Sequence, residues 1–462
     1  MIAGLRPAGR IGVEGDLARA TVHACDYAPL YQLACAEPDL CPALLESSAG
    51  AAAQSRYDIL LADPAGTITP EQLGSRSAFF DALDACAAKD CAPVTDLPFV
   101  GGWMVYLGYE MASGVEPGLD LPSADDGLPS ALALRCRSAI IHDRQRATLD
   151  VIAENADEGR VARLLALLEA LGNASAEPVA YPAIRWREDE PGSYLDAVAR
   201  AREYILAGDV FQANLARAWH GTLLEDTSPG TVYTALRAAN PAPFSALMHW
   251  QGAALICSSP ERLLALRDGR ASVRPIAGTR RRRFGRDAEI SEQLITHPKE
   301  RAEHVMLIDL VRNDLGRVCR PGSIEVGELM VVESYAHVHH IVSNVRGRLH
   351  DGVGPGAALK AVFPGGTITG CPKVRCMQII AELESVGRGA YTGSIGYLSR
   401  CGTMDTNIII RSLTQTGRDL TLRTGAGIVA DSNPESELAE TRHKAHGVLR
   451  AFRDSQTGTI DG

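Results

Sequence analysis

Two segments in the second half of the chain combine a helical spacing of apolar positions with glutamates on one face. In residues 298–316 a proline opens the pattern and a glycine closes it, and Glu300, Glu303, Leu307 and Leu310 share one face. The remaining positions are largely apolar too. The pattern therefore predicts a helix that is buried on most sides and turns its carboxylates into a closed site.

Residues 432–444 form the second acidic pattern. A capping residue precedes Pro434, and Glu437, Glu440 and Lys444 fall on one stripe. Carboxylates that converged from two such helices would form a site for a hard cation such as Mg2+, which keeps waters and binds substrate oxygens. The alternative for each helix taken alone is a solvent-exposed face of salt bridges.

Elsewhere the pattern indicates an α+β fold with antiparallel β-sheets flanked by helices, because successive strands follow one another with few crossover helices. The segment 407–413 would place Asn407, Ile409 and Arg411 on one face of a strand. A polar stretch divides the chain into an N-terminal region at 1–175, a linker at 176–184 and a second region at 185–456. Alternation predicts strands at 56–63, 99–109, 253–264, 271–279 and 407–413, and helices at 160–171 and 193–206.

The composition limits the classes of molecule that the protein is expected to bind. A net charge of −10 over 462 residues argues against a nucleic-acid surface and favours a small molecule or another protein. The eleven cysteines contain no C-x-x-C pair, which indicates reduced thiols of a cytoplasmic protein. We expect no signal peptide and no transmembrane span, because no long apolar run is present.

Two glycine-rich segments suit an anionic ligand. Residues 363–373 form a Gly/Pro turn before a helix, without the lysine pattern of a nucleotide-binding loop. Residues 424–428 would expose backbone amides, although such a segment alone is more often a strand bend. Together with Arg411 and Lys444, the amides of this segment suit a dicarboxylate, one carboxylate of which Mg2+ could take.

Three histidines stand close together at the start of another strand-like run. Strand alternation places His337 and His339 on one face and His340 on the other. The alternative, a zinc site, would require ligands in better mutual geometry.

A collinear series of motifs resembles the chorismate-utilising enzymes, which include the large subunits of anthranilate and aminodeoxychorismate synthases and the isochorismate and salicylate synthases. The resemblance is dense from about residue 196 to 452, and it implies their α+β fold of antiparallel sheets packed face to face. The motifs are SSPERLL (258–264), RPIAGT (274–279), ERAEHVMLIDLVRNDLG (300–316), HHIVS (339–343), FPGGTITGCPK (363–373), GSIGYLS (393–399), MDTNIIIRS (404–412) and GAGIVADSNPESELAET (425–441).

The resemblance implies Mg2+ as cofactor, bound by Glu303 and Glu440, with Glu300 and Glu437 acting through its waters. Glu261 would be the general acid that protonates the departing C4 hydroxyl of chorismate. It also implies two further groups of site residues. The catalytic set includes His340, Thr279 and the position of Ala277, and the substrate-binding set comprises Thr367, Tyr397, Arg411, Gly425, Ala426, Gly427 and Lys444.

Ala277 bears on the reaction. Family members that add water resemble one another in having a lysine there, so alanine implies ammonia as the nucleophile. Anthranilate synthases share the alanine, whereas most familiar aminodeoxychorismate synthases use a lysine that adds to C2. Five segments nevertheless resemble the aminodeoxychorismate branch: 55–58, 212–215, 240–246, 363–366 and 393–396. We therefore expect an aminodeoxychorismate synthase component I, with anthranilate synthase component I as the alternative.

Without that lysine, ammonia would reach C4 by direct displacement, or after transient addition of water or ammonia at C2. An adduct at a nearby lysine such as Lys373 would contradict this. No glutaminase segment is visible, so a separate glutamine amidotransferase subunit is the expected partner, and the product would lead to 4-aminobenzoate and folate. Two other classes stay open: an inactive chorismate or tryptophan sensor, and an assembly subunit for the glutaminase.

Leu45, Glu46 and Ser47 resemble the tryptophan-binding segment of the family. Bound tryptophan is therefore one expectation. An apolar strand end explains Leu44 and Leu45 equally well.

Overall fold

The computed structural model describes residues 11–23, 30–48, 56–172, 179–282, 285–334 and 338–454. Two arms of sheet depart from the long strand β6 (Ala131–Asp143). One edge of β6 pairs with β4 (Tyr57–Ile68), and the other pairs with β5 (Gly102–Leu107) and then with β7 (Thr148–Glu154). Strands β2 (Leu17–His23) and β1 (Gly12–Glu14) continue beyond β7.

Both arms are antiparallel, except where the short strand β22 (Arg453–Asp454) joins β8 (Ala183–Glu188). The first arm continues from β5 through β18 (Ser394–Ser399), β19 (Met404–Asn407), β12 (Arg262–Arg267), β13 (Arg270–Val273) and β16 (Val338–Arg348), which also pairs with β14 (Ile276–Arg281) and β15 (Glu325–Ser334). The second continues from β4 through β3 (Ala43–Glu46), β10 (Phe244–Trp250), β11 (Ala253–Ser259), β20 (Ser412–Thr416), β21 (Asp419–Ile428), β9 (Gln212–Leu223) and β8 (Ala183–Glu188). Two short strands, β17 (Gly370–Cys371) and β22 (Arg453–Asp454), join β9 and β8, the latter in parallel.

The two arms face each other across one apolar core. Met104 and Tyr106 of β5 lie in the same buried cluster as Met248 of β10 and Leu255 of β11. Side chains of alternate residues point to one face of a strand, so this cluster is formed by the inner faces of both arms. The predicted α+β fold with antiparallel sheets packed face to face is thereby confirmed.

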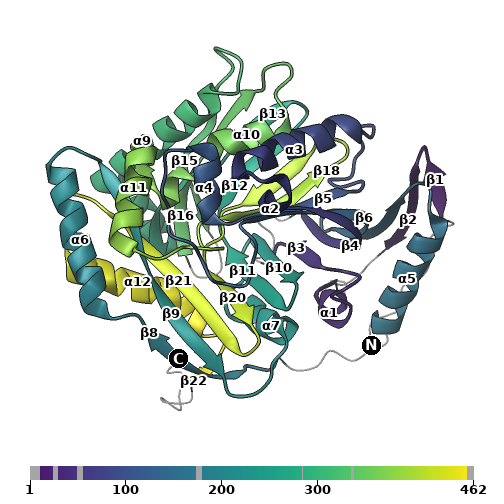
Figure 1. Ribbon diagram of the computed structural model, residues 1–462, viewed down its shortest axis with the longest axis horizontal. Helices are drawn as coiled ribbons and strands as arrows, with labels where there is room; N and C mark the ends of the chain where they lie inside the picture. Colours follow the sequence, from purple (N-terminus) through teal and green to yellow (C-terminus); the bar gives the residue numbers. More distant parts are fainter. Residues whose placement is uncertain are drawn as a thin grey trace.

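Helices cover the outer faces (Figure 1). Over the first arm lie α3 (Arg76–Lys89), α4 (Ala112–Val115), α8 (Asp287–Thr296), α9 (Pro298–Gly316) and α10 (Pro355–Val362). Beside β9 and β21 lie α6 (Pro191–Leu206), α11 (Lys373–Glu384) and α12 (Pro434–Leu449). Of the other helices, α1 (Leu30–Ala36) contacts β3 and β4, α7 (Pro229–Ala239) contacts β10 and β11, and α5 (Glu158–Gly172) packs on β2, β6 and β7. The remaining short helices are α2 (Pro70–Leu73), η1 (Tyr109–Met111) and η2 (Gly366–Ile368).

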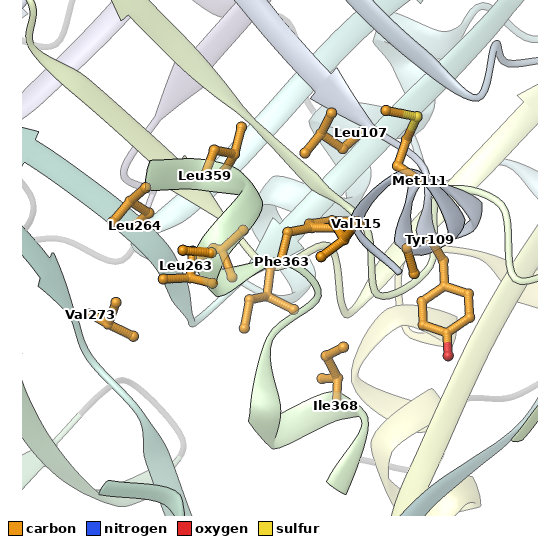
Figure 2. Close-up of a cluster of buried hydrophobic side chains, with 14 of the residues drawn as sticks. Leu107, Tyr109, Met111, Val115, Leu263, Leu264, Val273, Leu359, Phe363 and Ile368 are labelled. Carbon is orange, nitrogen blue, oxygen red and sulfur yellow. The ribbon is translucent and has the colours of Figure 1, made fainter. Parts of the chain in front are cut away.

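Residues from both halves of the sequence share one core beneath the first group of helices. Figure 2 shows Leu107, Tyr109 and Val115 of the first half around Phe363, with Leu263 and Leu359 on its other side. Phe363 is 1% exposed and anchors the turn that leads into η2. The division at 176–184 stays a prediction, and part of that linker lies outside the described residues. Across it, β5 pairs with β18 and β3 pairs with β10.

The local signals at the ends of the two acidic helices are confirmed. Pro298 and Pro434 both stand in the first turn, and Asn433 caps α12 by accepting a hydrogen bond from the amide of Ser436 at 2.9 Å. The expectation that α9 is buried on most sides is wrong. Val305 is 48% exposed and Ala302 is exposed as well, so α9 packs through one face only.

The strand expected at 407–413 is interrupted. β19 ends at Asn407, β20 begins at Ser412, and Arg411 between them has a positive φ of 54°. Backbone bonds hold this break, because Ile408 donates to the carbonyl of Glu261 at 3.0 Å and Ser258 donates to the carbonyl of Arg411 at 3.2 Å. The expected common face of Asn407, Ile409 and Arg411 is therefore wrong. Separately, the described helices include none with the length and hydropathy needed to cross a membrane.

Candidate active site

Glu261 is the buried acid of the candidate site. It directly precedes β12, is 5% exposed, and accepts a 2.8 Å hydrogen bond at Oε1 from the hydroxyl of Thr367 on η2. Burial raises the pKa of Glu261 to about 7, although the bonds from Thr367 and the Ile276 amide and the charges of Arg411 and Lys444 oppose the rise. A carboxyl group with this pKa can donate a proton near neutral pH.

Arg411 brings a cation to the same place. Its left-handed backbone at the break between β19 and β20 directs the residue towards Glu261, Glu440 and Tyr391, which all act on its charge. Within the described part of the chain the guanidinium has no hydrogen-bond or ion-pair partner. Burial accordingly lowers the pKa of Arg411. An unpaired, largely desolvated arginine is the group expected to bind a substrate carboxylate.

Gly425 and Gly427, which together are called the glycine wall below, leave room on one face of β21, whose edge pairs with β9. A Cβ at Gly425 would lie 2.7 Å from Asn214 Oδ1 and 2.9 Å from the hydroxyl of Tyr391, and a Cβ at Gly427 would lie 2.3 Å from Gln212 Nε2. Ala426 is fully buried on the opposite face. The glycines are therefore required by close approach, and the strand-bend alternative does not explain these contacts.

Lys444 of α12 fixes the far side of this glycine wall. Its ammonium group donates to the carbonyl of Gly425 at 2.8 Å and pairs with Glu440 at 2.7 Å. Lys444 and Glu440 are one helical turn apart, as their predicted stripe requires. The ammonium group reaches the charge field of Glu261, so the cations of Lys444 and Arg411 both act on the acid.

Two buried amide oxygens beside Gly425 and Gly427 have no hydrogen-bond donor in the part of the chain that the structure describes. Gln212 is 4% exposed and Asn214 is 8% exposed, and these two oxygens are Gln212 Oε1 and Asn214 Oδ1. Unsatisfied buried acceptors are costly in a closed protein and point to a bound group or water that donates to them. In the sequence, residues 212–215 stood out only by their resemblance to the aminodeoxychorismate branch. The polar residues Gln212 and Asn214 lie two positions apart on one strand, and this spacing could have indicated that both side chains face the site.

Tyr391, and not Tyr397, is the tyrosine of this site. Tyr397 lies in the core between the two arms, where its ring makes an edge contact with Phe99 at 6.0 Å. The charges that act on the Tyr397 hydroxyl come chiefly from the ion-paired Asp405 and Arg262, and neither Glu261 nor Arg411 is among them. By contrast, Tyr391 lies beside Gly425 and Arg411. The structure thus brings Tyr391, and not the predicted Tyr397, next to Gly425 and Arg411, while a role of either residue in substrate binding stays a prediction.

The four glutamates border the site from two helices. Glu303 of α9 accepts a 3.2 Å hydrogen bond from Gln212, and Glu300 pairs with Arg280 at 3.0 Å. From α12, Glu437 and Glu440 both act on the buried hydroxyl of Tyr194. In the described ranges no three histidine, cysteine or acidic side chains converge as ligands, so the predicted convergence of the glutamates from the two helices is not observed. Carboxylate oxygens are nevertheless ligands of the class that a hard cation takes, and Gln212 Oε1, which has no partner among the described residues, adds an oxygen of that class beside Glu303.

His340 lies on β16 across from Thr279, and Ala277 pairs with Ile341. His340 is 5% exposed, and its pKa is lowered to about 4, chiefly by burial, so the imidazole is neutral at pH 7. A bulge at Gly278, with a φ of 64°, separates the two positions of β14. Ala277 itself is 6% exposed. The side chain of Thr279 and all of His337 lie outside the described residues.

His339 faces the other way, as alternation predicts. It contacts Ser334 at 2.8 Å and Asp287 of α8 at 3.2 Å. Lys373 also points elsewhere, since its ammonium group pairs with Asp314 of α9 at 2.7 Å and donates to the carbonyl of Val362 at 3.2 Å. Neither residue contributes to the group around Glu261.

The segment proposed for tryptophan forms the end of β3 and the residue that follows it. Leu45 pairs with Ala246 of β10, and Glu46 is 3% exposed and bound by Arg237 at 2.7 Å. The amide of Ser47 donates to Asp58 at 2.9 Å, while its buried hydroxyl has no partner among the residues that the structure describes. Apart from that hydroxyl, the polar groups of the segment are used within the protein.

Comparison with known proteins shows which family the chain matches. A family model described as chorismate binding enzyme matches residues 42–450. The chain is 40% identical to aminodeoxychorismate synthase component 1 of Bacillus subtilis (strain 168), over 78% of this chain and 79% of the relative. It is 41% identical to anthranilate synthase component 1 of Acinetobacter calcoaceticus, over 80% of this chain and 78% of the relative. Overall identity therefore does not separate the two branches.

Solved structures agree at the level of the fold. Anthranilate synthase component I from Streptococcus pneumoniae TIGR4 superimposes with a TM-score of 0.75 at 30% identity, covering 85% of this chain and 92% of that chain. The isochorismate synthase MenF from Escherichia coli superimposes with a TM-score of 0.70 at 18% identity, covering 96% of this chain and 97% of that chain.

Proposed function

The chain belongs to the chorismate binding enzyme family, and from this premise we propose that it is an aminodeoxychorismate synthase component I. It would convert chorismate and ammonia to 4-amino-4-deoxychorismate and water. The observation that carries the proposal is the buried Glu261, whose pKa of about 7 makes it an acid near neutral pH. Hydroxide is a poor leaving group, so loss of the C4 hydroxyl requires such a proton donor.

In the proposed reaction the nitrogen of ammonia forms a bond to C4 as the C4–oxygen bond breaks. Glu261 gives its proton to the departing oxygen, which leaves as water. The new ammonium nitrogen then loses one proton, and return of that proton to the Glu261 carboxylate restores the acid. Atoms and charges balance over the cycle without a covalent intermediate on the protein. Transient addition of water or ammonia at C2 is a variant of the same scheme.

The substrate carboxylates would lie between Arg411, Tyr391 and the amides of the glycine wall. Arg411 has no described partner in the protein, so a carboxylate can bind its guanidinium without displacing another acid. We propose that Mg2+ is held by Glu303 and Glu440, with Glu300 and Glu437 acting through its waters. When bound, this ion would neutralise and orient a substrate carboxylate.

The choice of C4 rests on the five sequence segments that resemble the aminodeoxychorismate branch. Ala277 favours the second candidate, anthranilate synthase component I, which would aminate C2. Ammonia would come from a glutamine amidotransferase subunit in either case. Bound tryptophan at Glu46 and Ser47 also stays a proposal.

Product identification tests the proposal. The purified chain is incubated with chorismate, Mg2+ and ammonium, with and without an added aminodeoxychorismate lyase, and products are identified by mass and fluorescence. An amino-substituted chorismate that yields 4-aminobenzoate only with the lyase is expected. Anthranilate formed without lyase would establish the second candidate. No turnover, under conditions where the chain binds chorismate, would favour a sensor. Activity with ammonium alone would exclude a role limited to glutaminase assembly.

A further inference from the structure

Arg388 is a buried cation whose side chain is bound by protein groups on several sides. It follows α11, and its side chain is 1% exposed. Glu384, 4% exposed and one helical turn earlier, accepts hydrogen bonds from its Nε at 2.9 Å and its Nη2 at 2.5 Å. Glu384 also accepts the amide of Ala216 on β9 at 2.8 Å. A bidentate pair of this kind fixes the plane of the guanidinium.

The N–H groups of Arg388 that do not bond to Glu384 donate to two other parts of the site, the turn that holds Thr367 and the strand β9. Nη2 donates to the carbonyl of Asn214 at 2.7 Å, and Nη1 donates to the carbonyl of Ile368 at 3.1 Å. Asn214 pairs in register with Gly427 of the glycine wall. Ile368 directly follows Thr367, whose hydroxyl binds Glu261. One guanidinium thus connects the acid's hydrogen-bond donor with the strand behind the glycines.

Arg388 also lies near the ring of Tyr391, and residues Tyr109 and Glu110 from the first half of the chain contact Arg388. The guanidinium lies 4.8 Å from the ring of Tyr109 and 5.7 Å from the ring of Tyr391. The amides of Arg388 and Gly389 donate to one carboxylate oxygen of Glu110, at 2.8 and 3.2 Å. Every donor of Arg388 is therefore directed by a fixed acceptor, and the segment cannot shift without moving both the Thr367 turn and β9.

We propose that Arg388 is a positioning residue that holds the Thr367 turn against Glu261 and the β9 strand behind the glycine wall. This inference rests on the proposed function, because it assigns Arg388 to the placement of the proton donor used there. Lysine at this position keeps the charge but has a single donor atom, which cannot reach Glu384, Asn214 and Ile368 together. A purely structural ion pair would instead affect only the amount of folded protein.

The pH dependence of turnover separates these two roles. The groups facing Glu261 are Thr367, the Ile276 amide, Arg411 and Lys444, and the Thr367 bond lowers the pKa of Glu261. In the proposed reaction kcat falls at alkaline pH because Glu261 loses its proton, and this fall is the alkaline limb of the pH profile. Loosening the Thr367 bond should raise the pKa of Glu261 and move the limb to higher pH by roughly one unit, with kcat measured as chorismate consumption per folded protein. Misplacement of the donor should also reduce kcat roughly ten- to a hundredfold. We expect both effects in Arg388→Lys, and the limb shift in Glu384→Gln.

Arg135 provides the matched control. It is also largely buried, pairs with Glu154, and donates to the carbonyls of Gly102 and Cys136, yet none of these residues borders the site. Arg135→Lys should change thermal stability and leave the limb in place. In a Thr367→Val background the shift caused by Arg388→Lys should disappear, because the bond it acts through is already gone.

An unmoved limb in Arg388→Lys, with a loss of kcat no larger than in Arg135→Lys, would overturn the inference. If Arg388→Lys does not fold, Glu384→Gln decides the question by the same limb. Absence of turnover in the unmodified chain would count against the proposed function. Infrared titration of the Glu261 carboxyl group, assigned with Glu261→Gln, would then still show whether Arg388→Lys or Glu384→Gln raises its pKa.

Discussion

Replacement of Glu261 by glutamine should reduce turnover and, at alkaline pH, stabilise the protein. Glutamine has nearly the same shape and can still accept the hydrogen bond that Thr367 donates at 2.8 Å. It cannot donate the proton that the leaving hydroxyl requires. We therefore expect kcat for chorismate consumption to fall roughly 10²- to 10⁴-fold.

The effect on stability follows from the raised pKa. A pKa raised from 4.5 to about 7 corresponds to roughly 3 kcal/mol that burial imposes on the ionised group. Between these two pH values the folded chain binds more protons than the unfolded chain, so the free energy of unfolding falls as pH rises. This stability is fully present below pH 4.5 and is lost as pH passes through 7. Glutamine does not ionise and avoids the loss.

Thermal unfolding of the two proteins at pH 5 and pH 8 measures this difference. At pH 8 the Glu261→Gln variant should unfold roughly 3 °C above the unmodified protein, and at pH 5 the two should nearly coincide. Glu203→Gln is the control, since this glutamate lies on α6 with 64% of its side chain exposed, and it should leave both values unchanged. An equal gap at both pH values would refute the raised pKa. Retained turnover would refute the assignment of the acid.

Three further outcomes test the rest of the site. Gly425→Ala would place a methyl group 2.7 Å from Asn214 Oδ1, so KM for chorismate, from initial rates, should rise at least roughly tenfold while the circular dichroism spectrum is retained. Tyr391→Phe should raise that KM several-fold, whereas Tyr397→Phe should leave it unchanged; the reverse order would restore the original sequence-based assignment. Chelation with EDTA should abolish turnover and added Mg2+ should restore it, and Glu303→Gln should raise the Mg2+ concentration that gives half-maximal rate, a shift that must be absent if this glutamate is no ligand.

Helix ends could be predicted accurately, because the residues that start, cap and end a helix lie within one or two turns of its ends. The extent of α9 was predictable because a proline in the first turn and a terminal glycine are local features, and the same holds for the Asn433 cap of α12. The exposure of Val305 was not predictable in this way. An apolar residue on a helix is buried only where another element packs against it, and the sequence of α9 does not specify which faces are covered.

The tyrosine and the strand break required long-range information. Tyr391 and Tyr397 stand six positions apart in one glycine-rich motif, and only the register of β18 against β5 directs Tyr397 into the core. The left-handed backbone of Arg411 depends on bonds to Ser258 and to Glu261 of a distant segment. Alternation within 407–413 contained no sign of it. The unpaired oxygens of Gln212 and Asn214 became visible only once the surrounding donors were placed.

The two lysines named near the site, Lys373 and Lys444, are both bound by other groups of the protein, and this affects which amine could be the nucleophile in the proposed reaction. Lys373 is bound to Asp314 and the Val362 carbonyl, and Lys444 is bound to Glu440 and the Gly425 carbonyl. Each would have to give up an ion pair of 2.7 Å before its amine could attack a ring carbon. With alanine at 277, ammonia that enters from outside the protein is therefore the nucleophile most consistent with the described contacts, and in the proposed reaction the orientation of the ring by Arg411 and the glycine wall would determine which carbon is aminated.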